Sequence, residues 1–163
     1  MESVVVGLNL CPFAGAVRRK ELVKITVCTE RLPESCLQTL IVEANQLELA
    51  DEDATTLLIL PDGFEKFDDY LDLLALSEAL LEDRGFDGIL QLASFHPQYQ
   101  FAGTDVDDVS NWTNRAPYPV LHLLKESSVS KAVESHSDPG RIPERNVKTL
   151  EELGLPALLK LLN

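Results

Sequence analysis

Strand patterns and helix patterns alternate along the first part of this chain, and the alternation limits the folds open to it. Residues 22–28 alternate apolar and polar side chains, residues 55–60 form a continuous apolar run, and residues 89–95 form a third short apolar segment. Residues 33–47 and 64–84 lie between them and carry apolar side chains at helical spacing. Strands joined through helices by short connections form βαβ units. The sequence therefore predicts an α/β fold, a small two-layer or three-layer domain with a central parallel sheet of about three strands.

The later part of the chain is less regular. Residues 119 to about 134 and residues 150–162 predict two further helices. Asp105 is expected to cap a short helix that runs from Val106 to about Trp112. Residues 1–20 fit a strand and a helix equally well.

Length and cysteine usage indicate the class of protein. A chain of 163 residues suits one domain, residues 1–163, which buries about 68–70% of its unfolded surface. Its apolar runs are shorter than the ~20 residues that a membrane span needs, and Glu2 stands where a signal peptide would carry basic residues. Three cysteines without a CxxC pair fit a reducing compartment. We therefore expect a cytoplasmic protein with no membrane partner.

The charge of this acidic protein is unevenly distributed. The formal net charge is −13, and residues 43–87 carry 14 acidic residues against Lys66 and Arg84, a net charge of −12. Nucleic acids and anionic membranes select basic surfaces, so neither is expected as a partner. The acidic excess is interpreted as a solvated face. The sequence leaves the oligomeric state undetermined.

Residues 94–122 are crowded with polar and aromatic side chains and have no regular apolar period in their first two-thirds. Long irregular connections inside compact domains are often functional, and the aromatic content here argues against disorder. The segment begins where the third strand ends. Because ligands of open α/β sheets bind outside the carboxyl ends of the strands, this segment is the predicted site.

His96 and three aspartates are the candidates for chemistry in this segment. His96 precedes Pro97 at the strand end, where an imidazole could act as a general acid or base. The alternative is a structural histidine whose ring nitrogens tie down the following loop. Asp105 and Asp108, with Asp107 between them, could supply a second catalytic carboxylate or bind a divalent cation. Capping of a short helix is the simpler interpretation of these aspartates, and no metal site is predicted.

Ligand binding is assigned to the amides, aromatic rings and arginines of the same region. Arg115 could hold a carboxylate or phosphate in two hydrogen bonds, or could pair with an upstream aspartate instead. Arg145 lies in a second polar segment, residues 140–146, that could close over an anion or could carry ordinary surface arginines. His122 is interpreted as a core histidine. The remaining candidates are Asn111, Asn114, Tyr99, Trp112 and Tyr118, whose amides would orient the ligand and whose rings would form walls with polar tips.

Cys11 supports a different class of function. If Cys11-Pro12 begins a helix, its thiolate is stabilised by the helix N-terminus and by the nearby Arg18 and Arg19. The alternative, a buried structural cysteine, is favoured. Cys28 and Cys36 are interpreted as core residues.

An ordered series of motifs is similar to a known family. The motifs are GLNLCPFA, QLASFHPQYQFAGT, DD followed by NWTNRAPYPVLHLL, and IPERN. Together they resemble a bacterial protein family of unknown function (domain of unknown function 1415). The resemblance covers nearly the whole chain and implies a stand-alone, single-domain bacterial protein. It carries no established activity, and the sequence does not identify a cofactor.

Three functional hypotheses follow from these residues. The first is a small enzyme acting on an anionic metabolite at the carboxyl edge of the sheet, with His96 as acid or base and Arg115 as the anion-binding residue. The second is a non-catalytic module that binds a ligand or a protein through the same surface. The third is a thiol-dependent redox protein that uses Cys11.

Overall fold

The structure is a computed structural model, and it describes residues 7–8, 10–11, 20–135 and 138–162. Its centre is a four-stranded mixed sheet in the order β1-β2-β4-β3. The strands are β1 (Val23–Val27), β2 (Thr55–Ile59), β3 (Leu90–Phe95) and β4 (Val120–Lys125). The α/β class is therefore confirmed.

The strand β4 was not predicted as a strand. It lies between β2 and β3 and pairs antiparallel with both, whereas β1 and β2 are parallel. The prediction of a purely parallel sheet of three strands is therefore wrong, and so is the prediction of one helix from residue 119 to about 134. Since β4 is central and partly or fully buried along its length, its apolar run is nearly continuous and has no period that separates a strand from a helix.

The carboxyl ends of the three predicted strands nevertheless meet at one edge. Val27 of β1 is level with Ile59 of β2, which is level with Val120 at the start of β4. Val120 is in turn level with Phe95, the last residue of β3. The long connection of residues 96–119 thus leaves β3 and enters β4 at this same edge, which makes β4 antiparallel to its neighbours.

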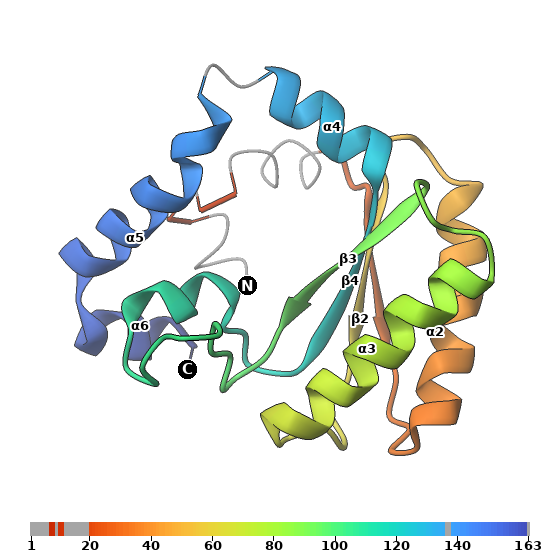
Figure 1. The fold of residues 1–163 in the computed structure, drawn as a ribbon, viewed down its shortest axis with the longest axis horizontal. Coiled ribbons are helices and arrows are strands. Elements are labelled where there is room, and N and C mark those ends of the chain that lie inside the picture. Colours follow the sequence, from red (N-terminus) through yellow and green to blue (C-terminus); the bar gives the residue numbers. More distant parts are fainter. Residues whose placement is uncertain (1–6, 9, 12–19, 136–137, 163) are drawn as a thin grey trace.

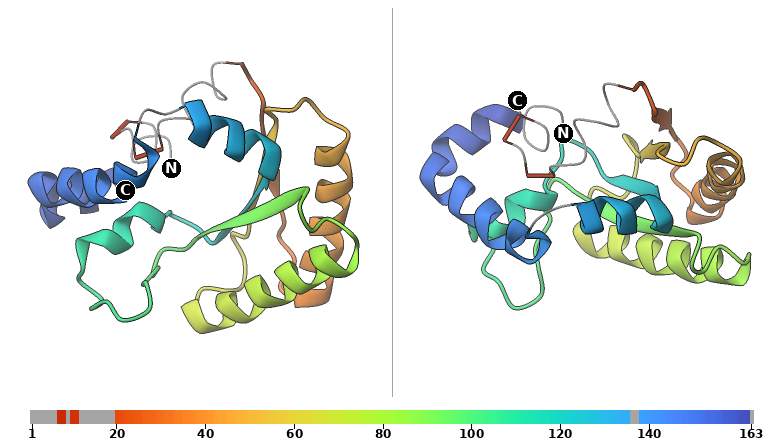
Figure 2. Two further views of the ribbon diagram at one scale, coloured as in Figure 1. Left: turned by 45° about the horizontal axis from the view of Figure 1, so that its top comes forward. Right: turned by 90° about the horizontal axis from the view of Figure 1, so that it is seen from above.

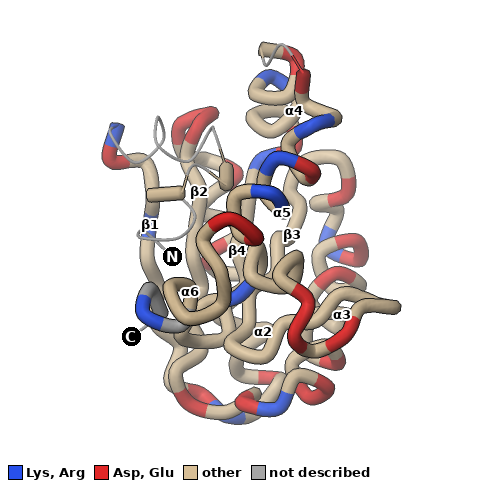
Figure 3. Tube along the Cα trace, turned by 90° about the vertical axis from the view of Figure 1, so that its left-hand side faces the viewer, with Lys and Arg blue, Asp and Glu red and all other residues tan. Residues whose placement is uncertain are grey.

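Two helices cover one face of the sheet (Figure 1). They are α2 (Pro33–Glu48) and α3 (Phe67–Asp83), as the apolar spacing predicts. Their apolar sides pack with the strands into the main core, while the acidic residues of α3 lie exposed on its other side (Figure 3). The core includes Cys36, Leu40, Leu58, Tyr70 and Leu123.

The C-terminal helices form a second cluster beside the end of β3. The chain continues through α4 (Glu126–Ser135), η3 (Pro139–Arg141), α5 (Ile142–Leu153) and α6 (Leu155–Leu162), and α5 and α6 lie away from α2 and α3 (Figure 2). Gly154, with φ of 75°, separates the last two helices, so the single helix predicted for residues 150–162 is wrong. Trp112, Leu150 and Leu158 are the buried centre of this cluster together with Leu10.

The second sheet face carries a smaller apolar cluster. Phe95, Ala116 and Val120 are its buried members, and Leu57 and Ile59 pack against them. Toward β1 the same face is exposed, because Ile25 and Val27 are 61% and 57% exposed. None of the described helices is both long and apolar enough to cross a membrane.

Candidate functional site

His96 is a fully buried residue whose two ring nitrogens both have partners. Its Nδ1 accepts a hydrogen bond from the Gln98 backbone N–H at 3.0 Å, so Nε2 carries the proton and donates to the Phe64 carbonyl at 2.9 Å. The Phe67 and Tyr70 rings lie about the imidazole, with centroids 5.2 and 5.1 Å away. Burial lowers the pKa of His96, against the opposing effect of the Phe64 hydrogen bond. The ring is neutral and holds the start of the loop against the β2–α3 connection.

Asn111 fastens the middle of the same loop. It is fully buried in the 3₁₀ helix η2 (Val109–Asn114). Its Oδ1 accepts from the Phe101 N–H at 2.9 Å, and its Nδ2 donates to the Asp105 carbonyl at 2.9 Å. The Thr104 hydroxyl lies 3.0 Å from the same Oδ1. The amide therefore replaces main-chain pairing that an irregular loop cannot supply itself.

Asn114 ties η2 to the end of β3. Its Nδ2 donates to the Ser94 carbonyl at 3.0 Å, and its own carbonyl accepts from the His96 N–H at 3.1 Å. Its Oδ1 accepts from the Thr113 hydroxyl at 2.9 Å. A carbonyl oxygen has two lone pairs, so Oδ1 can accept one further hydrogen bond.

Arg115 is bonded to the main chain of the loop. Its Nη2 donates to the Val106 carbonyl at 2.7 Å and its Nε to the Tyr99 carbonyl at 3.3 Å. The guanidinium lies 5.1 Å from the centre of the Trp112 ring, a cation–π contact. Burial lowers the pKa of Arg115, while Asp107 raises it. These bonds close the loop across residues 99–106.

The two candidate carboxylates do not lie together in a pocket. Asp108, not Asp105, caps the 3₁₀ helix, and its Oδ1 accepts from the Ser110 N–H at 2.8 Å. The helix therefore begins later than predicted, and the Ser110 hydrogen bonds lower the pKa of Asp108. The exposed Asp105 enters this arrangement through its backbone carbonyl. Within the described residues, no group of three or more His, Cys, Asp or Glu is arranged to hold a metal ion.

The candidate aromatic residues lie in three different surroundings. Tyr99 lies between Phe67 and Phe101 in a tilted and an edge-on ring contact, with centroids 5.3 and 5.0 Å away. Trp112 is 1% exposed and belongs to the C-terminal cluster. Tyr118 is 52% exposed on the chain that enters β4.

His122 lies on β4 at the less covered sheet face. The Thr55 hydroxyl donates to the Leu123 carbonyl at 2.6 Å and accepts from His122 Nε2 at 2.6 Å. Burial lowers the pKa of His122 to about 4. Its role as a satisfied core histidine agrees with this geometry, although its position in a strand was not predicted.

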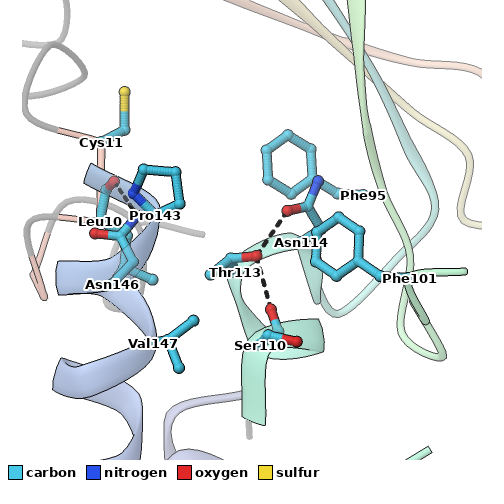
Figure 4. A pocket seen from close by; sticks show the side chains of 10 residues that line it. All are labelled: Leu10, Cys11, Phe95, Phe101, Ser110, Thr113, Asn114, Pro143, Asn146 and Val147. Carbon is cyan, nitrogen blue, oxygen red and sulfur yellow. Dashed lines mark hydrogen bonds between the residues drawn. The ribbon is translucent and has the colours of Figure 1, made fainter. Parts of the chain in front are cut away.

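A recess of about 430 Å³ lies beside these residues, between η2 and α5 (Figure 4). One side of the recess is formed by Phe95, Phe101, Thr113 and Asn114, and the other side by Pro143, Asn146 and Val147. No Lys or Arg is among the described residues that line it. The full lining comprises Leu10, Cys11, Phe95, Phe101, Ser110, Thr113, Asn114, Pro143, Asn146 and Val147.

Two of the candidate residues from outside the loop lie at or near the recess. Cys11 lines its edge and is partly buried, whereas Pro12, Ala14, Arg18 and Arg19 fall outside the described residues, so the predicted helix start is not described. Arg145 is exposed on α5. Its neighbour Asn146 is buried and donates to the Leu10 carbonyl at 2.7 Å, which joins the N-terminal segment to α5.

Two of the eleven predicted site residues, Cys11 and Asn114, line the recess. The sequence does not identify the apolar lining residues Phe95, Phe101 and Val147 as site residues, because each fits an ordinary strand, loop or helix pattern. The polar segment around Arg145 was a partial signal, since the neighbouring Pro143 and Asn146 line the recess.

Comparison with known proteins gives a family and no activity. The chain belongs to the family described as "Protein of unknown function (DUF1415)", whose sequence profile matches residues 1–160. The family resemblance predicted from the motifs is therefore confirmed. No curated protein and no solved structure matches the chain.

Proposed function

We propose that this protein binds a small, mainly apolar and uncharged ligand in the recess between η2 and α5. The observation that carries the proposal is the recess itself, whose walls come from the end of β3, the 96–119 loop, α5 and the N-terminal segment. A ligand site is typically a concave, mostly apolar cavity with a few placed polar groups. Phe95, Phe101 and Val147 supply the apolar surface, and Asn114 supplies the polar group.

The expected charge of the ligand follows from the residues that line the recess and from the net charge of the protein. No cationic residue is among the described residues of the recess, and the protein carries a formal charge of −13. Among these described residues, an anion would therefore lose hydration without gaining a cationic partner. Arg115, the predicted anion-binding residue, donates to two main-chain carbonyls of its own loop. An uncharged ligand that donates one hydrogen bond to Asn114 Oδ1 fits these groups best.

A matched series of probes tests this proposal. Benzyl alcohol, benzoate and benzylamine share one ring and differ in charge, so their effects on the thermal midpoint isolate the charge preference. At about ten times its dissociation constant, a ligand stabilises by about 1.4 kcal/mol, which raises the midpoint of a domain this size by about 3–6 °C. We expect this shift with benzyl alcohol and a smaller one with either ion. A larger shift with benzoate would favour the enzyme acting on an anionic metabolite.

A filled-recess variant locates the binding. Val147→Phe adds a ring to the wall formed by α5 and should weaken benzyl alcohol binding at least about tenfold. Val133→Phe makes the same change on α4, where the side chain is 40% exposed, and should leave binding unchanged. Equal binding to both variants would place the ligand elsewhere and end the proposal.

A second candidate function is a thiol-dependent reaction of the bound ligand, and the position of Cys11 at the edge of the recess favours it. N-phenylmaleimide adds a thiol to its double bond and carries a ring that the recess can hold. We expect it to modify Cys11 at least about tenfold faster, relative to free glutathione, than N-methylmaleimide does. Equal relative rates would leave Cys11 without a role in reaction.

A further inference from the structure

The other two cysteines face each other in the main core. Cys28 directly follows β1 and Cys36 lies in the first turns of α2, and their sulfur atoms are 3.7 Å apart. The residues are 4% and 1% exposed. The Cys36 thiol lies 3.3 Å from the Glu30 carbonyl, to which it donates, and the Cys28 sulfur lies 3.8 Å from Thr39 Oγ1. The two thiols are thus packed against each other and share a partly polar environment.

The segment between the two cysteines is exposed and lacks a side-chain cap at the start of α2. A disulfide bond joins sulfur atoms at about 2.05 Å, so the sulfurs must approach by roughly 1.7 Å. Residues 29–32 are exposed, and Leu32, which caps α2, makes no side-chain capping hydrogen bond. The first turn of α2 is therefore less firmly held than the helix behind it. Rotation of either cysteine side chain and a small shift of this turn supply the required approach.

We propose that Cys28 and Cys36 form a dithiol that closes to an intramolecular disulfide within the folded protein when it meets a peroxide. In the first step the Cys28 sulfur attacks a peroxide oxygen, the O–O bond breaks, and a sulfenic acid and water form. In the second step the Cys36 sulfur displaces the hydroxyl from Cys28, and the thiol proton leaves with it as a second water. The two thiols lose two electrons and hydrogen peroxide gains them.

Burial makes this pair slower to react than the thiol at the recess. Desolvation, first, and the Cys28 contact raise the pKa of Cys36 to about 12, which keeps it protonated at rest. Cys11 is only partly buried. Cys11 is therefore the first thiol to meet an oxidant, and the Cys28–Cys36 pair responds to sustained exposure.

The chain allows a direct test by peptide mapping. In the Cys11→Ser variant, Cys28 and Cys36 are the remaining cysteines, and trypsin cleavage after Lys24, Arg31 and Lys66 puts them in separate peptides. After hydrogen peroxide treatment of the folded protein, peptides 25–31 and 32–66 should appear cross-linked and should separate on reduction. The bond closes a short loop and should raise the thermal midpoint by about 5–10 °C. The matched control is Cys11→Ser with Cys36→Ser, which should give neither the cross-link nor the higher midpoint.

The rate distinguishes closure in the folded protein from oxidation of unfolded chains. Closure in the folded protein should proceed at nearly the same rate with and without ~1 M urea, a concentration that leaves the fold intact. A route through global unfolding would accelerate about tenfold under that change. Acceleration of that size, or a cross-link that forms only in denaturant, would overturn the proposal.

Discussion

The 96–119 loop and the recess beside it are built in opposite ways. The loop is dense in polar side chains, but these side chains bond to main-chain groups. Asn111 and Arg115 donate to carbonyls of the loop itself, Asn114 donates to the end of β3, and His96 donates to the β2–α3 connection. The recess exposes mainly apolar surface, although its lining includes Ser110, Thr113, Asn114 and Asn146, and it has a volume of about 430 Å³. The difference indicates that the polar side chains of this loop satisfy main-chain groups, whereas the recess, where we propose that a ligand binds, is lined largely by residues of ordinary patterns.

The largest loss of stability is expected when the buried amide of Asn111 is removed from the loop. Asn111→Ala leaves the Phe101 N–H and the Asp105 carbonyl without their partner and creates a cavity, so it should lower the free energy of unfolding by about 3–4 kcal/mol. Asn45→Ala, on the exposed side of α2, should cost no more than about 0.5 kcal/mol. Urea unfolding measures both. Similar small losses would mean that the loop does not depend on its internal hydrogen bonds.

Acid should weaken the fold through two histidines, the half-buried His122 and the buried His96. The pKa of His122 is lowered to about 4 in the folded state, so below its ordinary value near 6.5 the unfolded state binds more protons. Stability is therefore complete above pH 6.5 and is lost as the pH falls toward 4, by about 3 kcal/mol for this residue. The pKa of His96 is lowered as well, so its contribution has the same sign.

Unfolding curves at pH 7 and pH 4.5 check this expectation. The His122→Gln variant should show a pH dependence that is flatter than that of the parent protein. An unchanged dependence would show that His122 is not titrating in this range.

Replacement of Arg115 should lower the stability by a smaller amount. A lysine, which keeps only the positive charge, should not restore it. Arg115→Lys keeps the charge but loses the fork that reaches both Val106 and Tyr99, and the flat contact with Trp112. We expect a loss of about 1–2 kcal/mol in the free energy of unfolding. Arg84→Lys at the exposed end of α3 is the control and should change little. A fully stable Arg115→Lys variant would leave the guanidinium available to a ligand instead.

The smallest effect on stability is expected at the recess. Cys11→Ser should change the free energy of unfolding by less than about 0.5 kcal/mol, because the side chain is only partly buried. The same variant should remove the one rapid reaction with iodoacetamide, since Cys28 and Cys36 are buried. Mass spectrometry counts the labelled thiols. Rapid labelling of two or three thiols in the folded protein would contradict the burial of the pair.

Local patterns were enough to predict β1, β2, β3, α2 and α3, because each has the period or the continuous apolar run of its class. The pattern of β4 carries no such information, since a short apolar run buried on both sides fits either class. Side-chain contacts in the loop could not be predicted from local sequence either. The sequence identifies His96 and Arg115 as unusual but cannot show that Phe64 and Val106, distant along the chain, accept their hydrogen bonds. The recess arises from α5 meeting η2, a tertiary contact that local periodicity does not encode.

The most direct test of this account is the position of a bound probe. A crystal structure of the protein soaked in benzyl alcohol should show the ring between Phe101 and Val147, with its hydroxyl near Asn114 Oδ1. The hydrogen bonds of His96, Asn111 and Arg115 within the loop should remain unchanged. A probe bound instead to the exposed sheet face at Ile25 and Val27, or one that displaces Arg115 from the Val106 carbonyl, would contradict the division between a self-bonded loop and a binding recess.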